Sequence, residues 1–170
     1  MRAREDAPSI AMQLVGWLVA SRHRLVLAES CTCGLAAASI GAIPGASQVF
    51  CGSLVTYRVS SKVDWLSVPD ELIDSFTAES PQTTLAMATA AMERTPDASI
   101  AAAITGHLGP DAPTDVDGLI HLAWLHRNDS GHIFTESIRL TSQSRAERQT
   151  EAATRLLNAV LTLRKTLVDR

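Results

Sequence analysis

The chain has 170 residues, a length typical of one compact domain that buries its own core. Its net charge of −3 is not clustered, which argues against a nucleic-acid partner, and no apolar segment is long enough to cross a bilayer. Three cysteines without framework spacing argue against disulfide bonds and indicate a reducing compartment, so we expect a cytoplasmic protein without a membrane partner.

The predicted elements alternate between helices and strands along most of the chain. In order they are helix 8–22, strand 24–29, helix 34–43, strand 49–57, helical pieces 62–66 and 69–76, helix 81–94, strands 98–105, 119–126 and 132–140, and helix 144–167. A turn at 128–131 joins the last two strands. Strands separated by helices and followed by a hairpin predict an α/β fold. We expect a single three-layer α/β/α-type domain over residues 1–170, with a mixed sheet of about five or six strands flanked by helices.

Two stretches between these elements have the character of functional loops. The segment "ESCTCG" (29–34) joins a buried strand to a helix built from small residues. The segment "GHLGPDAPTDVDG" (106–118) holds three glycines and two prolines and is too long and irregular for a tight hairpin.

Ser30 lies where the first strand ends and the next helix begins. This position lifts a side chain to the carboxyl edge of a sheet and directs unpaired helix N–H groups at the same place. Such groups stabilise an anion or a developing oxyanion, and Gly34 lets the backbone approach a ligand closely. The alternative is structural, with Ser30 or Thr32 acting only as the helix N-cap.

A serine nucleophile needs a base, and Lys62 is one candidate. If the second strand lies beside the first, Tyr57 and Lys62 reach the same sheet edge as Ser30. A partly desolvated lysine there has a lowered pKa and can accept the serine proton. The alternative is that Lys62 is an ordinary surface lysine.

The cysteines and histidines raise further possibilities. Cys31 and Cys33 could form a zinc site with Cys51 and His107, but zinc sites usually show two well-spaced ligand pairs, and the second pair is missing. Cys31 could be a nucleophile at a helix N-terminus, although no histidine partner is implied. His107 could touch a ligand from the glycine-containing loop. No metal site is predicted.

Several motifs together resemble those of a known family. The chain contains "AESCTCG" (28–34), "PGASQVFCGSLVTYRVSSK" (44–62), "TGHLGP" (105–110), "DGLIHLA" (117–123) and "RAERQ" (145–149), in order and with matching spacing. They are similar to the motifs of the C-terminal domain of the competence/damage-inducible protein CinA and of the stand-alone nicotinamide mononucleotide amidases called PncC. The resemblance covers about residues 10–165.

The resemblance implies a serine/lysine amidohydrolase that needs neither metal nor cofactor and converts nicotinamide mononucleotide to the nicotinate form and ammonia. Ser30 would then be the nucleophile, Lys62 its general base, and Tyr57 a residue that orients or polarises the pair. The implied substrate-binding residues are Cys31, Thr32, Cys33 and Gly34, whose N–H groups would form the oxyanion hole, Thr105, Gly106 and His107 of the pocket, and Arg148 for the phosphate.

The chain also departs from the family pattern. Cys33 replaces a glycine, His107-Leu108 replaces Ile-Ala, Thr141-Ser142-Gln143 replaces Gly-Asp-Arg, and residues 58–61 differ from the usual Ser-Asn-Glu-Ala. These changes leave two hypotheses: an amidase of altered specificity, or a nucleotide-binding or scaffolding module without catalysis. In either case we expect a small-molecule nucleotide as the partner and a homodimer or higher homo-oligomer.

Overall fold

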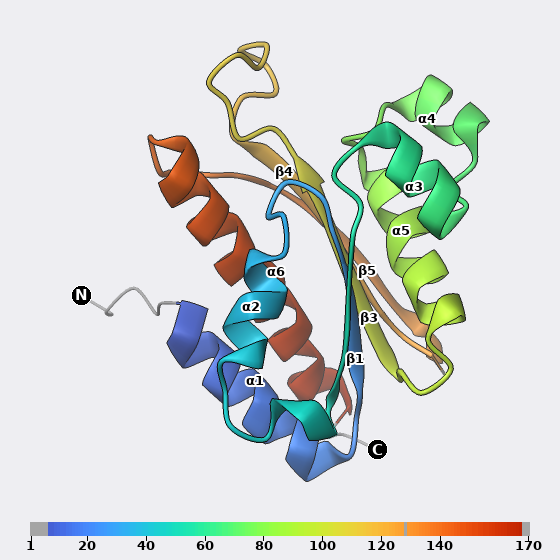
Figure 1. Ribbon diagram of the computed structural model, residues 1–170, viewed down its shortest axis with the longest axis vertical. Coiled ribbons are helices and arrows are strands. Elements are labelled where there is room, and N and C mark those ends of the chain that lie inside the picture. The colour runs from blue at the N-terminus through green and yellow to red at the C-terminus, as the bar shows by residue number, and fades with distance from the viewer. Residues whose placement is uncertain (1–6, 128, 168–170) are drawn as a thin grey trace.

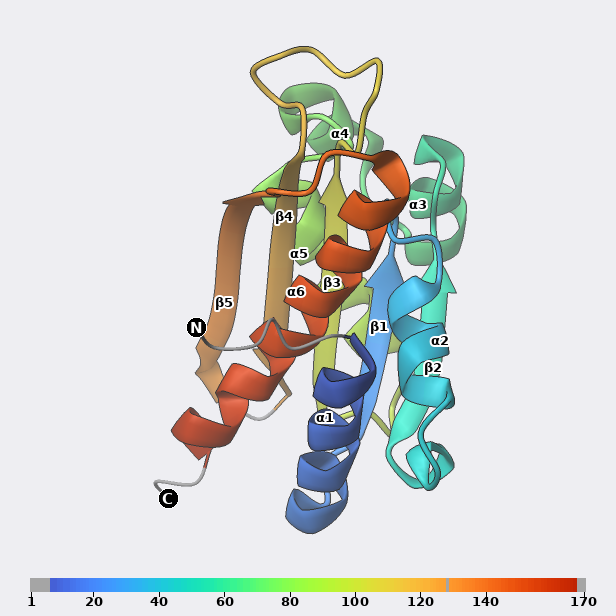
Figure 2. The ribbon, with the colours of Figure 1, turned by 90° about the vertical axis from the view of Figure 1, so that its left-hand side faces the viewer.

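A five-stranded mixed sheet forms the centre of the fold, with strands in the order β2-β1-β3-β4-β5 (Figure 2). The computed structural model describes residues 7–127 and 129–167. β1 pairs in parallel with β2 and β3, whereas β3–β4 and β4–β5 are antiparallel. The strands are β1 (Leu25–Glu29), β2 (Phe50–Val55), β3 (Ile100–Gly106), β4 (Leu119–His126) and β5 (Asp129–Arg139). The predicted α/β class and mixed sheet are confirmed.

Helices cover both faces of the sheet. One face carries α1 (Ala7–Ser21), α2 (Leu35–Gly41) and α6 (Arg145–Leu167), which lie in front of the sheet in Figure 2. The other face carries α3 (Val59–Leu66), α4 (Asp70–Phe76) and α5 (Pro81–Arg94), as Figure 1 shows. A short 3-10 turn, η1 (Ala46–Gln48), precedes β2.

The alternation of side chains along β1 separates two cores. Leu25 and Leu27 pack on the side of α1, α2 and α6, whereas Val26 and Ala28 pack on the side of α5. Successive side chains of a strand point to opposite faces, so a strand covered on both sides is apolar throughout. Every residue of β1 is buried, which places the end of this strand deep in the molecule.

Most predicted boundaries differ from the observed ones by one or two residues, and α2, α3 and β5 show larger or better explained differences. α2 begins after Gly34, which adopts a left-handed conformation (φ 90°), so it is shorter than expected. α3 begins at Val59 rather than 62, because the Ser61 hydroxyl accepts a hydrogen bond from the Arg58 N–H and caps an earlier turn. β5 begins at Asp129 rather than 132, with an irregular register between Leu125 and His126; of the predicted turn, residue 128 lies outside the described residues.

None of the helices in the described part of the chain combines the length and the apolar character that a bilayer span requires.

Candidate active site

Ser30 follows directly after β1 and is nearly buried. Its N–H donates to the carbonyl oxygen of Ile104 on β3 at 3.1 Å. On the other side, the Thr56 N–H donates to the carbonyl oxygen of Glu29 at 2.8 Å. The carboxyl ends of three adjacent parallel strands therefore converge on the Ser30 hydroxyl, where α/β proteins commonly bind ligands.

Lys62 reaches this hydroxyl from the middle of α3. Its Nζ lies 3.0 Å from Ser30 Oγ and also donates to the carbonyl oxygen of Thr56 at 3.0 Å. The side chain is fully buried, so the alternative of a surface lysine is wrong. The expected meeting of hydroxyl and amine at this sheet edge is confirmed.

The environment of Lys62 makes its charged form less favourable than it is in water. Burial lowers the pKa of Lys62, and this effect outweighs the opposing influence of the Glu79 carboxylate. Among residues 7–127 and 129–167, no carboxylate forms an ion pair with its Nζ. A buried amine without a carboxylate partner is disfavoured in its charged form.

The N-terminus of α2 is occupied by the Glu29 carboxylate. Its Oε2 accepts from Thr32 Oγ1 (2.7 Å) and from the N–H groups of Gly34 and Ala36 (both 3.1 Å). Its Oε1 accepts from the Ala37 N–H at 2.9 Å, and also from the Ser53 hydroxyl. A carboxylate at a helix N-terminus satisfies the orphan donors and the helix dipole. Neither Ser30 nor Thr32 is the N-cap, and that alternative is wrong.

The expected oxyanion hole from the N–H groups of residues 31–34 is therefore only half available. The Cys33 N–H donates to the carbonyl oxygen of Ser30 at 3.0 Å, and the Gly34 N–H donates to Glu29. The N–H groups of Cys31 and Thr32 have no oxygen acceptor among the described residues. Cys31 is the one that borders the cleft described next.

A cleft of about 450 Å³ opens beside Ser30. Its walls come from the end of β1, the segment before α5, the loop after β3 and the start of α6. The lining residues are Ser30, Cys31, Tyr57, Glu79, Gly106, His107, Leu108, Gly109, Asp111, Ala112, Pro113 and Arg145.

Tyr57 lies in the cleft wall but not against the reactive pair. Its side chain is half exposed, and its hydroxyl accepts a hydrogen bond from Arg145 Nη2 at 2.9 Å. Neither Ser30 nor Lys62 has a hydrogen bond to Tyr57 within the described residues. The expectation that Tyr57 orients this pair is not met, because the tyrosine follows β2 by two residues and points toward α6 instead.

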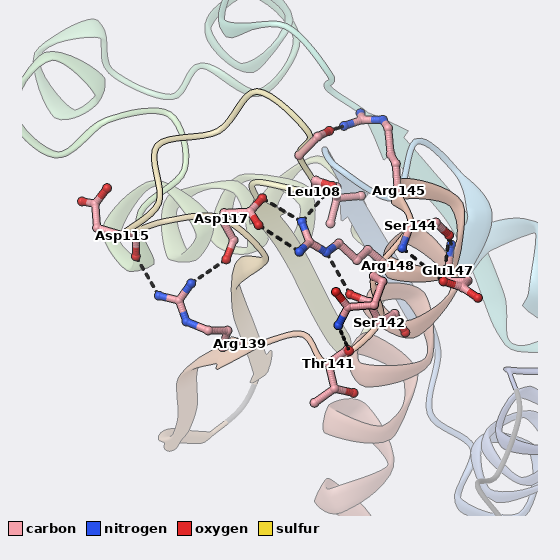
Figure 3. A network of polar contacts seen from close by, with 12 residues as sticks. Leu108, Asp115, Asp117, Arg139, Thr141, Ser142, Ser144, Arg145, Glu147 and Arg148 are labelled. Atoms are coloured by element: carbon pink, nitrogen blue, oxygen red, sulfur yellow. Dashed lines mark hydrogen bonds and ion pairs between the residues drawn. The ribbon is translucent and has the colours of Figure 1, made fainter.

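Arg148 is hydrogen-bonded to other residues of the protein (Figure 3) and lies outside the cleft lining. Its guanidinium pairs with both carboxylate oxygens of Asp117, at 2.7 and 2.9 Å, and also donates to the carbonyl oxygens of Ser142 and Leu108. The hydrogen bond from Arg148 lowers the pKa of Asp117. Arg148 therefore holds the loop between β3 and β4. The expectation that Arg148 binds a phosphate is corrected, because its guanidinium is already paired with Asp117 and with backbone carbonyls.

Arg139 and Arg145 complete the attachment of this loop. Arg139 donates to the carbonyl oxygens of Asp115 and Asp117, and Arg145 donates to that of Gly109 (Figure 3). Of the two arginines in the first turn of α6, only Arg145 lines the cleft.

Of the two residues expected to line the pocket, Gly106 does so and Thr105 does not. Thr105 is fully buried, lies outside the cleft lining and bonds through its hydroxyl to that of Thr84 on α5 at 2.8 Å. Gly106 does line the cleft, and a Cβ at this position would lie 2.6 Å from the carbonyl oxygen of Leu119. Only glycine fits there.

Of the three cysteines, only Cys31 lines the cleft. Burial raises the pKa of the Cys31 thiol to about 12, which keeps it protonated and disfavours the alternative of a cysteine nucleophile. Cys33 is exposed, adopts a left-handed backbone conformation (φ 51°) and lies outside the cleft lining, as do Thr32 and Gly34. Across the described ranges, no three His, Cys, Asp or Glu side chains are placed to hold a metal ion.

Three charged residues of the cleft were not predicted: Glu79, Asp111 and Arg145. Arg145 belongs to the motif "RAERQ" that had drawn attention to Arg148, so the motif indicated the region but not the residue. Glu79 precedes the capping residue Ser80, a position that gave no functional signal in the sequence.

Comparisons with known proteins agree with this fold. A family model described as the CinA C-terminal domain matches residues 7–164. A CinA-like protein of Prochlorococcus marinus is 44% identical over 107 residues, which cover 62% of this chain and 24% of the relative. One from Mycobacterium sp. (strain JLS) is 33% identical over 159 residues, covering 92% of this chain and 37% of the relative. The chain thus spans well under half the length of these curated relatives.

Solved structures resemble the chain along nearly its whole length. A competence/damage inducible protein from Agrobacterium tumefaciens superposes with a TM-score of 0.88 at 32% identity, covering 96% of this chain and 99% of that one. A CinA superfamily protein from Escherichia coli superposes with a TM-score of 0.86 at 28% identity, covering 96% and 94%. The chain belongs to the CinA C-terminal domain family, whose members include amidohydrolases.

Proposed function

We propose that this chain is a metal-independent serine/lysine amidohydrolase that releases ammonia from a carboxamide. The observation that carries the proposal is the 3.0 Å contact between Ser30 Oγ and the buried amine of Lys62, beside an open cleft. A nucleophile within hydrogen-bond reach of a base with a lowered pKa is the arrangement that covalent catalysis needs.

The first half of the reaction acylates Ser30. Neutral Lys62 accepts the hydroxyl proton as Oγ attacks the carboxamide carbon, and its hydrogen bond to the Thr56 carbonyl keeps the amine in place. The backbone N–H of Cys31, which has no oxygen acceptor among the described residues and belongs to a residue that lines the cleft, is the donor we assign to the developing oxyanion. Protonated Lys62 then gives its proton to the leaving nitrogen, and ammonia departs.

The second half removes the acyl group. A water molecule attacks the ester carbon on Ser30 while Lys62, again neutral, accepts one of the water protons. The ester bond breaks and the proton returns to Ser30 Oγ. The products are the free carboxylic acid and the starting enzyme, without a metal or a redox change.

Nicotinamide mononucleotide is the substrate that this proposal favours, following the family resemblance. Its phosphate needs a cation, and Arg145 supplies a guanidinium in the cleft wall. Arg145 takes the role that the sequence had assigned to Arg148, whose donors are committed to Asp117 and to backbone carbonyls.

The non-catalytic alternative has one supporting observation. His107 and Leu108 replace the Ile-Ala of the family pattern, and both line the cleft. They add bulk beside the position a substrate would take. Binding of the nucleotide without ammonia release would favour this module over the enzyme.

Ammonia release from nicotinamide mononucleotide tests the proposal, with Ser30→Ala as the key variant. Loss of the nucleophile should lower kcat/KM by at least about a thousandfold. Ser39→Ala is the matched control, because within the described residues the Ser39 hydroxyl bonds only to the Leu35 carbonyl of its own helix, and Ser39 lies outside the cleft lining. Equal rates for the wild type and Ser30→Ala would end the catalytic proposal, and calorimetric titration of the same proteins would detect binding without turnover.

A further inference from the structure

Glu79 places a carboxylate in the cleft wall that the mechanism does not use. Its side chain is 29% exposed and its Oε2 lies 4.0 Å from His107 Nε2. The next residue, Ser80, caps α5 by accepting from the Thr83 N–H and donating to the Thr77 carbonyl. This cap fixes the backbone that carries Glu79.

The carboxylate and the Ser30 hydroxyl belong to residues that line the same cleft. Its charge acts on both the Lys62 amine and the Cys31 thiol, the two groups that flank Ser30. Its effect on Lys62 opposes the neutral form that a general base requires. Because Glu79 opposes the neutral form of Lys62, its presence in the cleft is not explained by assistance to the general base.

The cleft carries a positive group as well, on a different wall. Arg145 is held by the Tyr57 hydroxyl and the Gly109 carbonyl, whereas Glu79 lies beside His107. A ligand complementary to this arrangement has an anionic group for Arg145 and a positive charge close to the carbonyl that Ser30 attacks. A neutral acyl group would leave the carboxylate partly desolvated without compensation.

We propose that Glu79 is a specificity-determining residue that selects carboxamides borne on a cationic ring, by pairing its carboxylate with the positive charge of the ring. The inference rests on the proposed function for the placement of the amide at Ser30. An N-substituted pyridinium carries its charge in the ring that bears the carboxamide. The corresponding 1,4-dihydropyridine keeps the carboxamide, the ribose and the phosphate but is neutral in the ring, which makes the two forms a matched pair of ligands.

Calorimetric titration on a Ser30→Ala background measures this selection without interference from turnover. Nicotinamide mononucleotide and its dihydro form are each titrated, at mildly alkaline pH, into the background protein and into its Glu79→Gln derivative. We expect Glu79→Gln to lower the affinity for the pyridinium ligand about tenfold and to leave the affinity for the dihydro ligand unchanged. A tenfold change is the effect expected when a partly exposed charge pair is lost. Glu93→Gln makes the same chemical change on an exposed face of α5 outside the cleft and should affect neither ligand.

The outcomes separate the inference from the proposed function. Equal weakening of both ligands, no weakening, or no binding of either ligand overturns the role of Glu79. A carboxylate that only tunes Lys62 would change the pH profile of turnover but not the ratio of the two affinities. If the ratio shifts as expected while the protein with Ser30 intact releases no ammonia, the inference stands and the amidase proposal fails. Thermal midpoints of the variants show whether Glu79→Gln is folded.

Discussion

The protonation state of Lys62 decides whether it can act as the proposed general base for Ser30. Its amine is fully buried and bonds to two oxygens, those of Ser30 and Thr56, rather than to a carboxylate. Water would stabilise its charged form, and the protein interior provides little in exchange. A group of this kind is retained where its neutral form is needed, which is why strongly perturbed lysines concentrate at reactive sites.

The pH profile of kcat/KM follows from this lowered pKa. Protonation fills the lone pair that accepts the Ser30 proton, so activity should fall as the pH is lowered through the pKa of Lys62 and rise as the pH is raised. Initial rates of ammonia release across the pH range give the inflection. We expect it below 10.5, the ordinary value for lysine, and an inflection at that ordinary value would contradict a desolvated base.

Arg145 gives a second prediction at the scale of one residue. Arg145→Gln removes the cation in the cleft wall but leaves Ser30 and Lys62 untouched. We expect KM for nicotinamide mononucleotide to rise about tenfold with a smaller change in kcat, since the phosphate does not react. Nicotinamide riboside, which lacks the phosphate, is the control substrate, and an equal effect on both substrates would place the phosphate elsewhere.

The junction between β1 and α2 is the element that presents Ser30. Glu29 ends the strand, turns into the protein and binds N–H groups of the following helix, so the backbone at Ser30 is held from both sides. The motif that contains Glu29 and Ser30 therefore has a structural half and a reactive half. The sequence drew attention to Ser30, but it did not show that the carboxylate would take the helix N–H groups.

Glu29→Gln tests the structural half of this junction. The amide would present N–H₂ where the carboxylate accepts hydrogen bonds, leaving buried donors without an acceptor. We expect the free energy of unfolding to fall by about 2–3 kcal/mol in urea titrations. Glu136→Gln is a comparison on the β5 edge strand. Equal stability of wild type and Glu29→Gln would contradict the capping role.

The loop between β3 and β4 depends on the first turn of α6. The pair of Arg148 with Asp117 joins the loop to the helix, and the loop supplies one wall of the cleft. Arg148→Lys keeps the charge but cannot form the paired bonds to both carboxylate oxygens. We expect a several-fold higher KM with kcat less affected, and Asp117→Asn should give the same split. A large fall in kcat with unchanged KM would show that Arg148 acts on the reacting atoms instead.

At the scale of the whole molecule, local periodicity was sufficient to predict the order of elements. The meeting of Ser30 with Lys62 was predicted on the condition that the second strand lies beside the first, and the family resemblance supported it. The contacts of Tyr57, Thr105 and Arg148 could not be predicted, because each depends on a partner distant in the chain: Arg145, Thr84 and Asp117. Side chains near a predicted site can be assigned to it from the sequence, but only three-dimensional packing shows which of them are already bonded elsewhere.

The activation of Ser30 by a buried amine is the central claim, and kcat/KM of Lys62→Met tests it most directly. Met has a similar length and suits a buried position, so the variant should keep the stability of the wild type while its ammonia release falls at least about a thousandfold. Lys165→Met, at the exposed end of α6 and the only other lysine of the chain, should behave as the wild type. A Lys62→Met protein that retains the wild-type kcat/KM would contradict the account.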